Sequence, residues 1–348
     1  MRSRSRRPPP PQYRITRRSL SSRAIPDTAE TAIHPVRLNG VSTWGCQFQG
    51  ESGRNLAVST IRDFSGDLII IDYSADASAS GAFDAHAVDA MRHRPGDGNK
   101  KLIAYMSIGE AEVGRFYWEL AWTKRKKEMR NAPAWLHAPS VWGWEGNWIV
   151  NFWDAAWQNI IVDAPGSYLN RIIDAGFDGV FLDVVDVAGY WEEEVRGPVR
   201  HRHALEDMVA FVTKISRHAR IKRGQSNFLV IPNGTLLLKS EPYRSVISAV
   251  VIEDVIYDQA AQANDAPRLV KRPLEGDGSI AEIAAQLNPA IGDKLLVLAI
   301  DYLMDRPEDR EKIPAAAAAM TALYPYLAPY FTVRKLDRLC PPFGPAIS

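Results

Sequence analysis

The feature that most constrains this chain is a series of eight short apolar segments, separated by stretches long enough to form helices. Each segment has four to six residues, is rich in β-branched or aromatic side chains and is apolar almost without interruption. Such near-continuous apolar strands are typical of a parallel sheet that is buried on both faces. The segments are 44–48, 68–73, 102–106, 148–152, 179–182, 228–231, 249–252 and 295–300.

The alternation of these segments with helix-length stretches predicts an α/β protein, a single (β/α)8 TIM barrel over residues 41–338. Residues 156–175 carry apolar side chains at helical spacing, and residues 203–221 and 314–327 also predict helices. An open, doubly wound sheet is the competing fold, but no glycine-rich phosphate turn follows the first segment.

Both ends of the chain are predicted to lie outside the barrel. Residues 1–35, with eight arginines and four consecutive prolines, predict a disordered leader, and residues 339–348 predict a short C-terminal tail. Without its first 23 residues the chain has 34 basic and 41 acidic residues, so the barrel is mildly acidic, which argues against nucleic-acid binding. No stretch approaches the roughly 18 apolar residues of a membrane span. We therefore expect neither a nucleic acid nor a membrane as a partner. We also expect the protein to be a monomer.

Acidic or amide side chains follow seven of the eight predicted strands. In a parallel barrel the carboxyl ends of all strands meet on one face, where active sites are built. Helix N-capping is the alternative explanation for such residues, and it accounts for one or two positions rather than for all. The sequence therefore predicts a pocket lined by Asp72, Glu110, Glu112, Asp154, Asp183, Asp186, Asn233, Glu253, Asp254 and Asp301.

A ring of acids with flanking aromatic side chains suits either the binding of a hard cation or the cleavage of a glycosidic bond. Cleavage needs one carboxyl group as general acid and a second as nucleophile or base. The histidine pair His201 and His203 lies among arginines, so we expect no metal. Without a Gly-x-Ser-x-Gly turn, acyl transfer is disfavoured. The aromatic residues near the strand ends are Trp118, Trp142, Trp144, Trp153 and Tyr190.

Three long motifs resemble those of a known family. Residues 67–74 (DLIIIDYS), 103–112 (IAYMSIGEAE) and 176–183 (GFDGVFLD) are similar to glycoside hydrolase family 114, whose characterised members are endo-α-1,4-polygalactosaminidases. The similarity covers roughly residues 41–338. It continues through Phe152-Trp153-Asp154, Asn233-Gly234, Ile252-Glu253, Ile300-Asp301-Tyr302 and Pro329-Tyr330-Phe331.

The resemblance implies a barrel that hydrolyses α-1,4-linked galactosamine or N-acetylgalactosamine polysaccharide with no cofactor. It implies a catalytic pair at the ends of the fifth and seventh strands, with Asp183 as nucleophile and Glu253 as general acid/base, and hence retention. Asp186 and Asp301 are the other candidates for the partner carboxyl. The side chains expected to line the sugar subsites are Asp72, Tyr73, Tyr105, Glu110, Trp153, Asp186, Asn233, Asp301 and Tyr302.

Two features depart from the family pattern. Members commonly carry a basic residue before the aromatic pair on the fourth strand, where this chain has Asn151, so a subsite contact is expected to differ. Members are usually exported, which implies an extracellular protein, but the stretch after Arg17-Arg18 lacks the apolar run of a secretory signal.

Two functions from other classes stay open at this stage. One is a carbohydrate-binding barrel that has lost catalysis, although both Asp183 and Glu253 are retained. The other is a metal-dependent hydrolase that uses the ring of acids, which a strong chelator would inactivate. The sequence also leaves open whether Cys46 and Cys340 form a disulfide.

Overall fold

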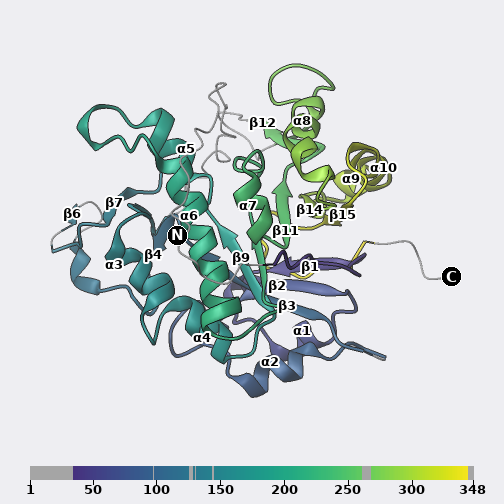
Figure 1. The fold of residues 1–348 in the computed structure, drawn as a ribbon. Helices are drawn as coiled ribbons and strands as arrows, with labels where there is room; N and C mark the ends of the chain where they lie inside the picture. The colour runs from purple at the N-terminus through teal and green to yellow at the C-terminus, as the bar shows by residue number, and fades with distance from the viewer. Residues whose placement is uncertain are drawn as a thin grey trace, which may run out of the picture.

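The computed structural model describes residues 34–96, 98–124, 128–129, 131–142, 145–260 and 268–343. Its centre is a ring of eight parallel strands, with helices packed around the outside (Figure 1). The parallel strands are β1 (Trp44–Gln47), β2 (Leu68–Asp72), β3 (Lys101–Ser107), β9 (Gly179–Asp183), β10 (Leu229–Pro232), β11 (Ala249–Glu253), β14 (Leu296–Asp301) and β15 (Leu327–Phe331). The fold is a (β/α)8 TIM barrel, as predicted.

The helices follow the strands as the barrel requires. Five of the ten described α-helices begin at a residue whose side chain caps the first turn, such as Ser279, which accepts from the backbone N–H of Glu282. The helices are α1 (Val58–Arg62), α2 (Ala85–Arg92), α3 (Ala155–Gln158), α4 (Tyr168–Asp174), α5 (Val187–Gly189), α6 (Ala204–Arg217), α7 (Glu241–Val246), α8 (Ile280–Ile291), α9 (Pro307–Arg310) and α10 (Ile313–Leu323).

Two arcs of hydrogen-bonded strands make up the barrel. The first runs β1-β2-β3-β9-β10 and the second β11-β14-β15. They meet between β10 and β11, where Ser248 N donates to Val230 O at 2.7 Å and Gly234 N to Val251 O at 2.8 Å. At the other seam the indole Nε1 of Trp44 in β1 donates to the carbonyl of Ala328 in β15 at 2.9 Å. This second seam is therefore joined by side chains.

One predicted strand lies outside the barrel. Residues 148–152 were expected to form its fourth strand, but β8 (Asn147–Val150) pairs antiparallel with β4 (Glu110–Glu112) and β7 (Leu136–Pro139), and β3 pairs directly with β9. The eighth place belongs to β15, whose first residue was predicted to end a helix. Apolar content does not tell one buried sheet from another. Pro329 makes residues 327–331 look unlike a strand, because proline has no N–H group to donate. It is tolerated in β15 because this strand forms a backbone hydrogen-bond ladder on one side only.

The expected helix over residues 156–175 is also interrupted. It consists of α3, a π-helical turn at Asn159–Asp163, and α4. The break contains Pro165 and Gly166, and α4 restarts with its own N-cap at Ser167.

Two further pairs of antiparallel strands lie outside the barrel. They are β5 (Thr123–Lys124) with β6 (Glu128–Met129), and β12 (Tyr257–Ala260) with β13 (Arg268–Lys271). Both lie in connections that follow the carboxyl end of a barrel strand.

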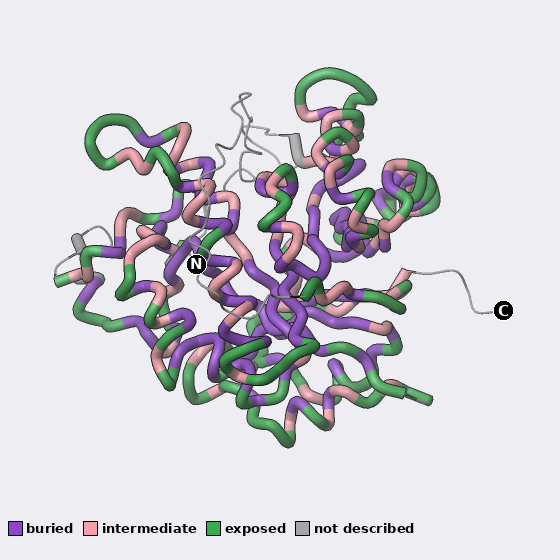
Figure 2. Tube along the Cα trace, viewed as in Figure 1, coloured by how far each residue is buried: buried purple, intermediate pink, exposed green. Residues whose placement is uncertain are grey.

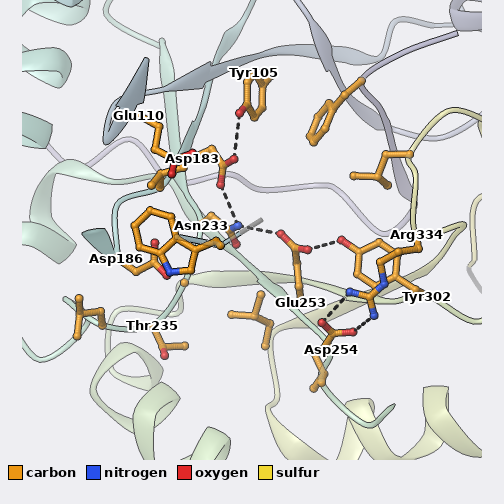
Figure 3. Close-up of a pocket in the computed structure, with 18 of the residues that line it drawn as sticks. Tyr105, Glu110, Asp183, Asp186, Asn233, Thr235, Glu253, Asp254, Tyr302 and Arg334 are labelled. Carbon is orange, nitrogen blue, oxygen red and sulfur yellow. Dashed lines mark hydrogen bonds and ion pairs between the residues drawn. The ribbon is translucent and has the colours of Figure 1, made fainter. Parts of the chain in front are cut away.

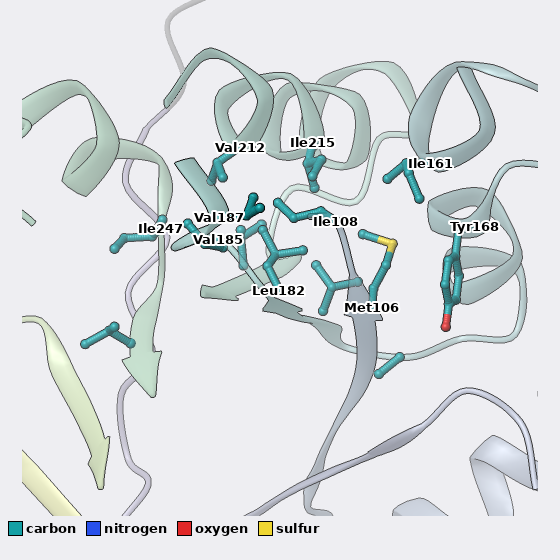
Figure 4. Packing of buried hydrophobic residues seen from close by; sticks show 14 of the residues in the cluster. Met106, Ile108, Ile161, Tyr168, Leu182, Val185, Val187, Val212, Ile215 and Ile247 are labelled. Atoms are coloured by element: carbon teal, nitrogen blue, oxygen red, sulfur yellow. The ribbon is translucent and has the colours of Figure 1, made fainter. Parts of the chain in front are cut away.

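Side chains along each barrel strand alternate between two cores, because successive residues of a strand point to opposite faces. The burial trace shows the strands almost entirely buried (Figure 2). The outward-facing core packs β3 and β9 against helices. Figure 4 shows Leu182 and Val187 beneath Val212 and Ile215 of α6. The inward-facing core includes Trp44, Cys46, Leu68, Ile70, Ile103, Tyr105, Phe181, Leu229, Ile231, Ala249, Val251, Leu298, Ile300, Ala328 and Tyr330.

The same alternation sorts the polar residues at the strand ends. Asp72, Asp183, Asn233, Glu253 and Tyr302 continue the inward-facing series by one step beyond the core. They therefore point into the carboxyl end of the barrel, where the structure places them around one cavity.

Two predicted site residues carry the outward register instead. Tyr73 is buried against the ring of Tyr168, with ring centroids 4.9 Å apart. Asp301 is fully buried, and its carboxylate accepts backbone N–H groups of Val255, Ile256 and Tyr257. Asp301 thus holds the turn after β11, and neither residue reaches the cavity.

The packed structure extends past the predicted bounds of 41–338. Leu38 belongs to the inward-facing core and its N–H donates to Ser248 O at 3.0 Å, while Cys340 is buried at the other end. Cys46 and Cys340 are both free thiols. Residues 1–33 of the predicted leader and 344–348 of the predicted tail lie outside the described residues. None of the described helices is long and apolar enough to cross a membrane.

Asp301→Ala should destabilise the fold. The substitution leaves three buried backbone donors without their acceptor, at a cost of about 2–5 kcal/mol in the free energy of unfolding. Urea unfolding followed by circular dichroism measures this loss. Glu119→Ala, which removes an exposed carboxylate, is the control and should lie within about 0.5 kcal/mol of the wild type. A variant at position 301 as stable as this control would contradict the role given to Asp301.

Candidate active site

A cavity of about 840 Å³ opens at the carboxyl ends of the barrel strands. Its lining comes from several strand ends and from the connections that follow them (Figure 3). The predicted site residues among this lining are Asp72, Tyr105, Glu110, Asp183, Asp186, Asn233, Glu253 and Tyr302.

Asn233 bridges the two carboxylates that were predicted to be catalytic. Its side-chain Nδ2 donates to Asp183 Oδ1 at 3.2 Å and to Glu253 Oε1 at 2.8 Å (Figure 3). Those two oxygens therefore lie no more than 6.0 Å apart, the length of the two bonds placed end to end. The residues stand at the ends of β9, β10 and β11, the fourth, fifth and sixth strands of the barrel rather than the expected fifth to seventh.

Each carboxylate has a tyrosine as a second partner. The hydroxyl of Tyr105 donates to Asp183 Oδ2 at 3.1 Å, and the hydroxyl of Tyr302 donates to Glu253 Oε2. A hydroxyl can accept as well as donate a hydrogen bond, so each contact survives a change in protonation of its carboxyl group.

A buried network supports the Asp183 side of the cavity. Arg115 is bound by Asp72, with Nη2–Oδ2 at 2.7 Å, and by Glu112, with Nε–Oε2 at 2.5 Å. Glu112 Oε1 in turn lies 3.1 Å from the hydroxyl of Tyr105. The guanidinium charge offsets the two carboxylates and links the end of β2 to the tyrosine that contacts Asp183.

The backbone is strained directly after both bridged carboxylates. Val184 has φ +58° and Asp254 has φ +53°, a left-handed conformation that costs about 1–2 kcal/mol per residue and is least tolerated by β-branched side chains. Gly109 makes room for the first of these turns, because a Cβ atom there would lie 2.1 Å from the carbonyl oxygen of Val184. Strain of this kind persists where the surrounding structure fixes a functional geometry.

Burial raises the pKa of four carboxyl groups that line the cavity: Glu110, Asp183, Asp186 and Glu253. Burial is the main cause for Asp183 and Glu253, opposed in both by the hydrogen bond from Asn233. Burial, with the nearby charge of Asp183, also raises the pKa of Asp186 to about 7. Burial raises the pKa of Glu110 to about 7, although Asn147 donates to it at 3.0 Å. At neutral pH the cavity therefore holds acids in both protonation states.

Three residues expected to line the sugar subsites do not reach the cavity: Tyr73, Trp153 and Asp301. Trp153 follows β8, which is not a barrel strand, and stacks on His201 with ring centroids 3.9 Å apart. Asn151, the departure from the family pattern, donates to the backbone carbonyl of Ala134 instead of lining the cavity.

The structure also places Asp154 and some of the aromatic residues that were expected near the strand ends. Asp154 caps α3, accepting from the N–H of Ala156 at 2.8 Å, which is the capping explanation weighed above. Of the aromatic residues near the strand ends, Trp142 lines the cavity, and Trp144 lies outside the described residues.

Several cavity residues were not among those expected to be catalytic or to line the sugar subsites. Glu112 follows β3 and was among the strand-end acids, and it reaches the cavity beside Arg115. Phe48 continues the inward register of β1, so the alternation of that strand could have indicated it. Arg334 comes from the segment after β15, a strand that the sequence did not indicate, so no local signal pointed to it.

Two carboxyl groups bridged by one amide, each with a hydroxyl partner, are suited to general acid and nucleophilic roles at a bond placed between them. Among the described residues, no group of three or more His, Cys, Asp or Glu side chains is arranged to hold a metal ion.

Gly109→Ala should disturb this site and the fold together. The added Cβ would displace the Val184 carbonyl and with it the adjoining Asp183, so we expect a loss of about 1–3 kcal/mol in the free energy of unfolding. Gly292→Ala is the matched control, because its Cβ would meet open space. Chemical unfolding of both variants tests this. Equal stability of the two would show that the turn tolerates the methyl group.

Comparisons with known proteins agree with this architecture. The model of glycoside hydrolase family GH114 matches residues 26–340. An uncharacterised protein from Methanocaldococcus jannaschii is 31% identical over 274 residues, which cover 78% of this chain and 69% of that protein. One from Thermotoga maritima is 30% identical over 250 residues, or 71% and 68% of the two chains.

A solved structure adds the same fold at lower identity. The glycoside hydrolase domain of PelA from Pseudomonas aeruginosa has a TM-score of 0.57 at 17% identity, covering 86% of this chain and 97% of that domain. That likeness concerns the barrel alone. Because the family model spans the barrel from end to end and two relatives reach 30% identity, this chain belongs to glycoside hydrolase family GH114.

Proposed function

We propose that this glycoside hydrolase cleaves α-1,4-linked galactosamine or N-acetylgalactosamine polysaccharide, with Asp183 as nucleophile and Glu253 as general acid/base. The observation that carries the proposal is the bridge formed by Asn233, which follows β10 and holds the carboxyl groups at the ends of β9 and β11 close together. The polymer assignment rests on the family resemblance of the motifs described above.

The spacing of the pair supports a retaining mechanism. Retaining glycosidases have carboxyl groups about 5–5.5 Å apart, whereas inverting enzymes need roughly 6.5–9.5 Å to fit a water molecule. The two facing oxygens share one amide donor and lie within 6.0 Å of each other, which supports the closer pair of a retaining enzyme. Asp183 would then attack the anomeric carbon while Glu253 protonates the leaving oxygen, and Glu253 would next take a proton from the water that releases the sugar.

The hydrogen bonds fit this division of roles. Asp183 accepts from the Tyr105 hydroxyl, the Asn233 amide and the backbone N–H of Val184, and such donors favour the ionised carboxylate that a nucleophile needs. Burial raises the pKa of both carboxyl groups, and for Glu253 this rise favours the protonated form that the first step requires.

Asp183→Asn and Glu253→Gln should each lower kcat on α-1,4-galactosaminan by a factor of about 10²–10⁴ or more, because each removes a group that acts on the reacting atoms. Release of reducing ends measures the rate. The melting temperature of each variant should stay near that of the wild type, since both substitutions keep the shape of the side chain.

The controls separate this assignment from its alternatives. Asp186→Asn tests the other candidate partner and should retain more activity than Glu253→Gln. Proton NMR of the first product should report an α anomer, as retention requires. Tight binding without hydrolysis by the wild type would instead support a carbohydrate-binding barrel, and loss of activity with a strong chelator a metal-dependent hydrolase.

Glu110 and Asp186 support recognition of a cationic amino sugar. Both line the cavity, and with pKa values of about 7 they gain negative charge as the pH rises through neutrality. An ionised carboxylate binds an ammonium group through charge-assisted hydrogen bonds that an N-acetyl group does not make. We therefore propose a preference for deacetylated units.

Glu110→Gln should lower kcat/KM by about tenfold on fully deacetylated polymer, the effect of one charge-assisted hydrogen bond, and by less on acetylated polymer. For the wild type, kcat/KM on the deacetylated polymer should rise between pH 6 and 7.5 as Glu110 ionises, and the variant should lack part of this rise. Initial rates on both polymers across that range measure the effect. An equal loss on the two polymers would contradict ammonium recognition.

A further inference from the structure

Arg334 lies beside the proposed acid/base without bonding to it. Its guanidinium carbon is 3.8 Å from the ring centroid of Tyr302, whose hydroxyl donates to Glu253. Both terminal nitrogens of Arg334 bind the carboxylate of Asp254, with Nη1–Oδ2 at 3.0 Å. Asp254 directly follows Glu253 in the chain. The side chains of Glu253, Tyr302, Arg334 and Asp254 therefore form a ring of contacts that is closed through the backbone (Figure 3).

Two further contacts hold this ring of side chains in place, one at Asp254 and one at Arg334. Asp254 is held in its left-handed backbone conformation by Arg272, whose Nε donates to the Asp254 carbonyl at 2.5 Å. The backbone N–H of Arg334 donates to Asp305 Oδ2 at 3.1 Å. The two anchored residues come from different parts of the fold, because Asp254 directly follows β11 while Arg334 lies in the segment after β15. The planar guanidinium therefore has a fixed position between an acid and an aromatic ring.

We propose that Arg334 is a positioning residue for Glu253: clamped by Asp254, it holds the Tyr302 ring so that the hydroxyl faces Glu253, and it keeps a positive charge beside that carboxyl group. The catalytic consequence rests on the proposed function of Glu253, but the effect on the carboxyl group itself does not.

The charge of Arg334 acts against the other influences on Glu253. A positive charge favours the ionised carboxylate, so Arg334 lowers the pKa of Glu253, whereas burial and the charge of Asp183 raise it. A poor balance would make Glu253 either a weak proton donor or a weak base in the second step. The titratable, charged and polar groups around Glu253 are Asp183, Asp186, Asn233, Asp254, Tyr302, Arg334 and the thiol of Cys46, with Lys335 at the exposed rim of the cavity.

A direct titration tests the proposal without relying on hydrolysis. Carbon-13 NMR of protein labelled at the glutamate δ-carbons follows the Glu253 signal, which Glu253→Gln identifies by its disappearance. In Arg334→Gln the pKa of Glu253 should rise by about one unit, because a positive charge is lost and the Asp254 charge is left without its partner. Arg338→Gln is the matched control, an exposed arginine four residues further along the same segment, and should leave the pKa unchanged.

Arg334→Lys supplies the second variant. The ammonium group keeps the charge but does not bind Asp254 through two nitrogens while stacking flat on Tyr302. The pKa of Glu253 should therefore lie between those of the wild type and Arg334→Gln. If Arg334→Gln does not fold, the lysine variant decides the matter, and an unshifted pKa in it would overturn the proposal. An unshifted pKa in a folded Arg334→Gln would do the same.

The pH dependence of kcat/KM then connects the titration to catalysis. In Arg334→Gln the alkaline limb of this profile should move to higher pH by about as much as the pKa of Glu253 rises. This limb reports the pKa of the acid in the free enzyme. A wild type that does not hydrolyse galactosaminan would contradict the proposed function, while the NMR titration would still give its own answer. A shifted pKa with an unmoved alkaline limb would overturn the link to the acid/base role.

Discussion

The alternation of side chains along a parallel strand is the constraint on which this site depends. Every second residue of each strand faces the interior of the barrel, and the first polar residue beyond the core inherits that direction. Asp183, Asn233 and Glu253 all occupy such positions at the ends of three adjacent strands. Their proximity follows from the register of the strands, so a shift of one residue in β11 would turn Glu253 out of the cavity.

This geometry collects negative charge in a place that disfavours it. Carboxyl groups buried near one another raise each other's pKa values, and an unpaired buried charge is costly. Two arginines offset the charge, Arg115 beside Asp72 and Glu112, and Arg334 beside Asp254. The pair formed by Asp183 and Glu253 is linked directly by the amide of Asn233. Each arginine is linked to one of the two bridged carboxyl groups through a tyrosine, since the guanidinium groups lie over the rings of Tyr105 and Tyr302.

The sequence was informative wherever the signal is local. Apolar runs located seven of the eight barrel strands, and the polar residues after them gave Asp183, Asn233 and Glu253. The alternation that removes Tyr73 and Asp301 from the cavity is also local, since both fall one residue out of step with the inward series. The rest depends on long-range pairing. The residues near position 148 do not indicate that this strand pairs with β4 rather than with β3. Arg334 lies at the site only because β15 completes the ring of strands.

The connection between β3 and β9 contributes a different part of the cavity from the barrel strands. Residues 108–178 leave the barrel, form the β4-β8-β7 sheet and return, and they supply Glu110, Glu112 and Arg115 to the cavity wall. The bridged pair and its amide come from the barrel strands themselves. Substitutions within this single connection would therefore reshape one wall of the cavity while the bridged carboxyl groups stay in register on the barrel strands.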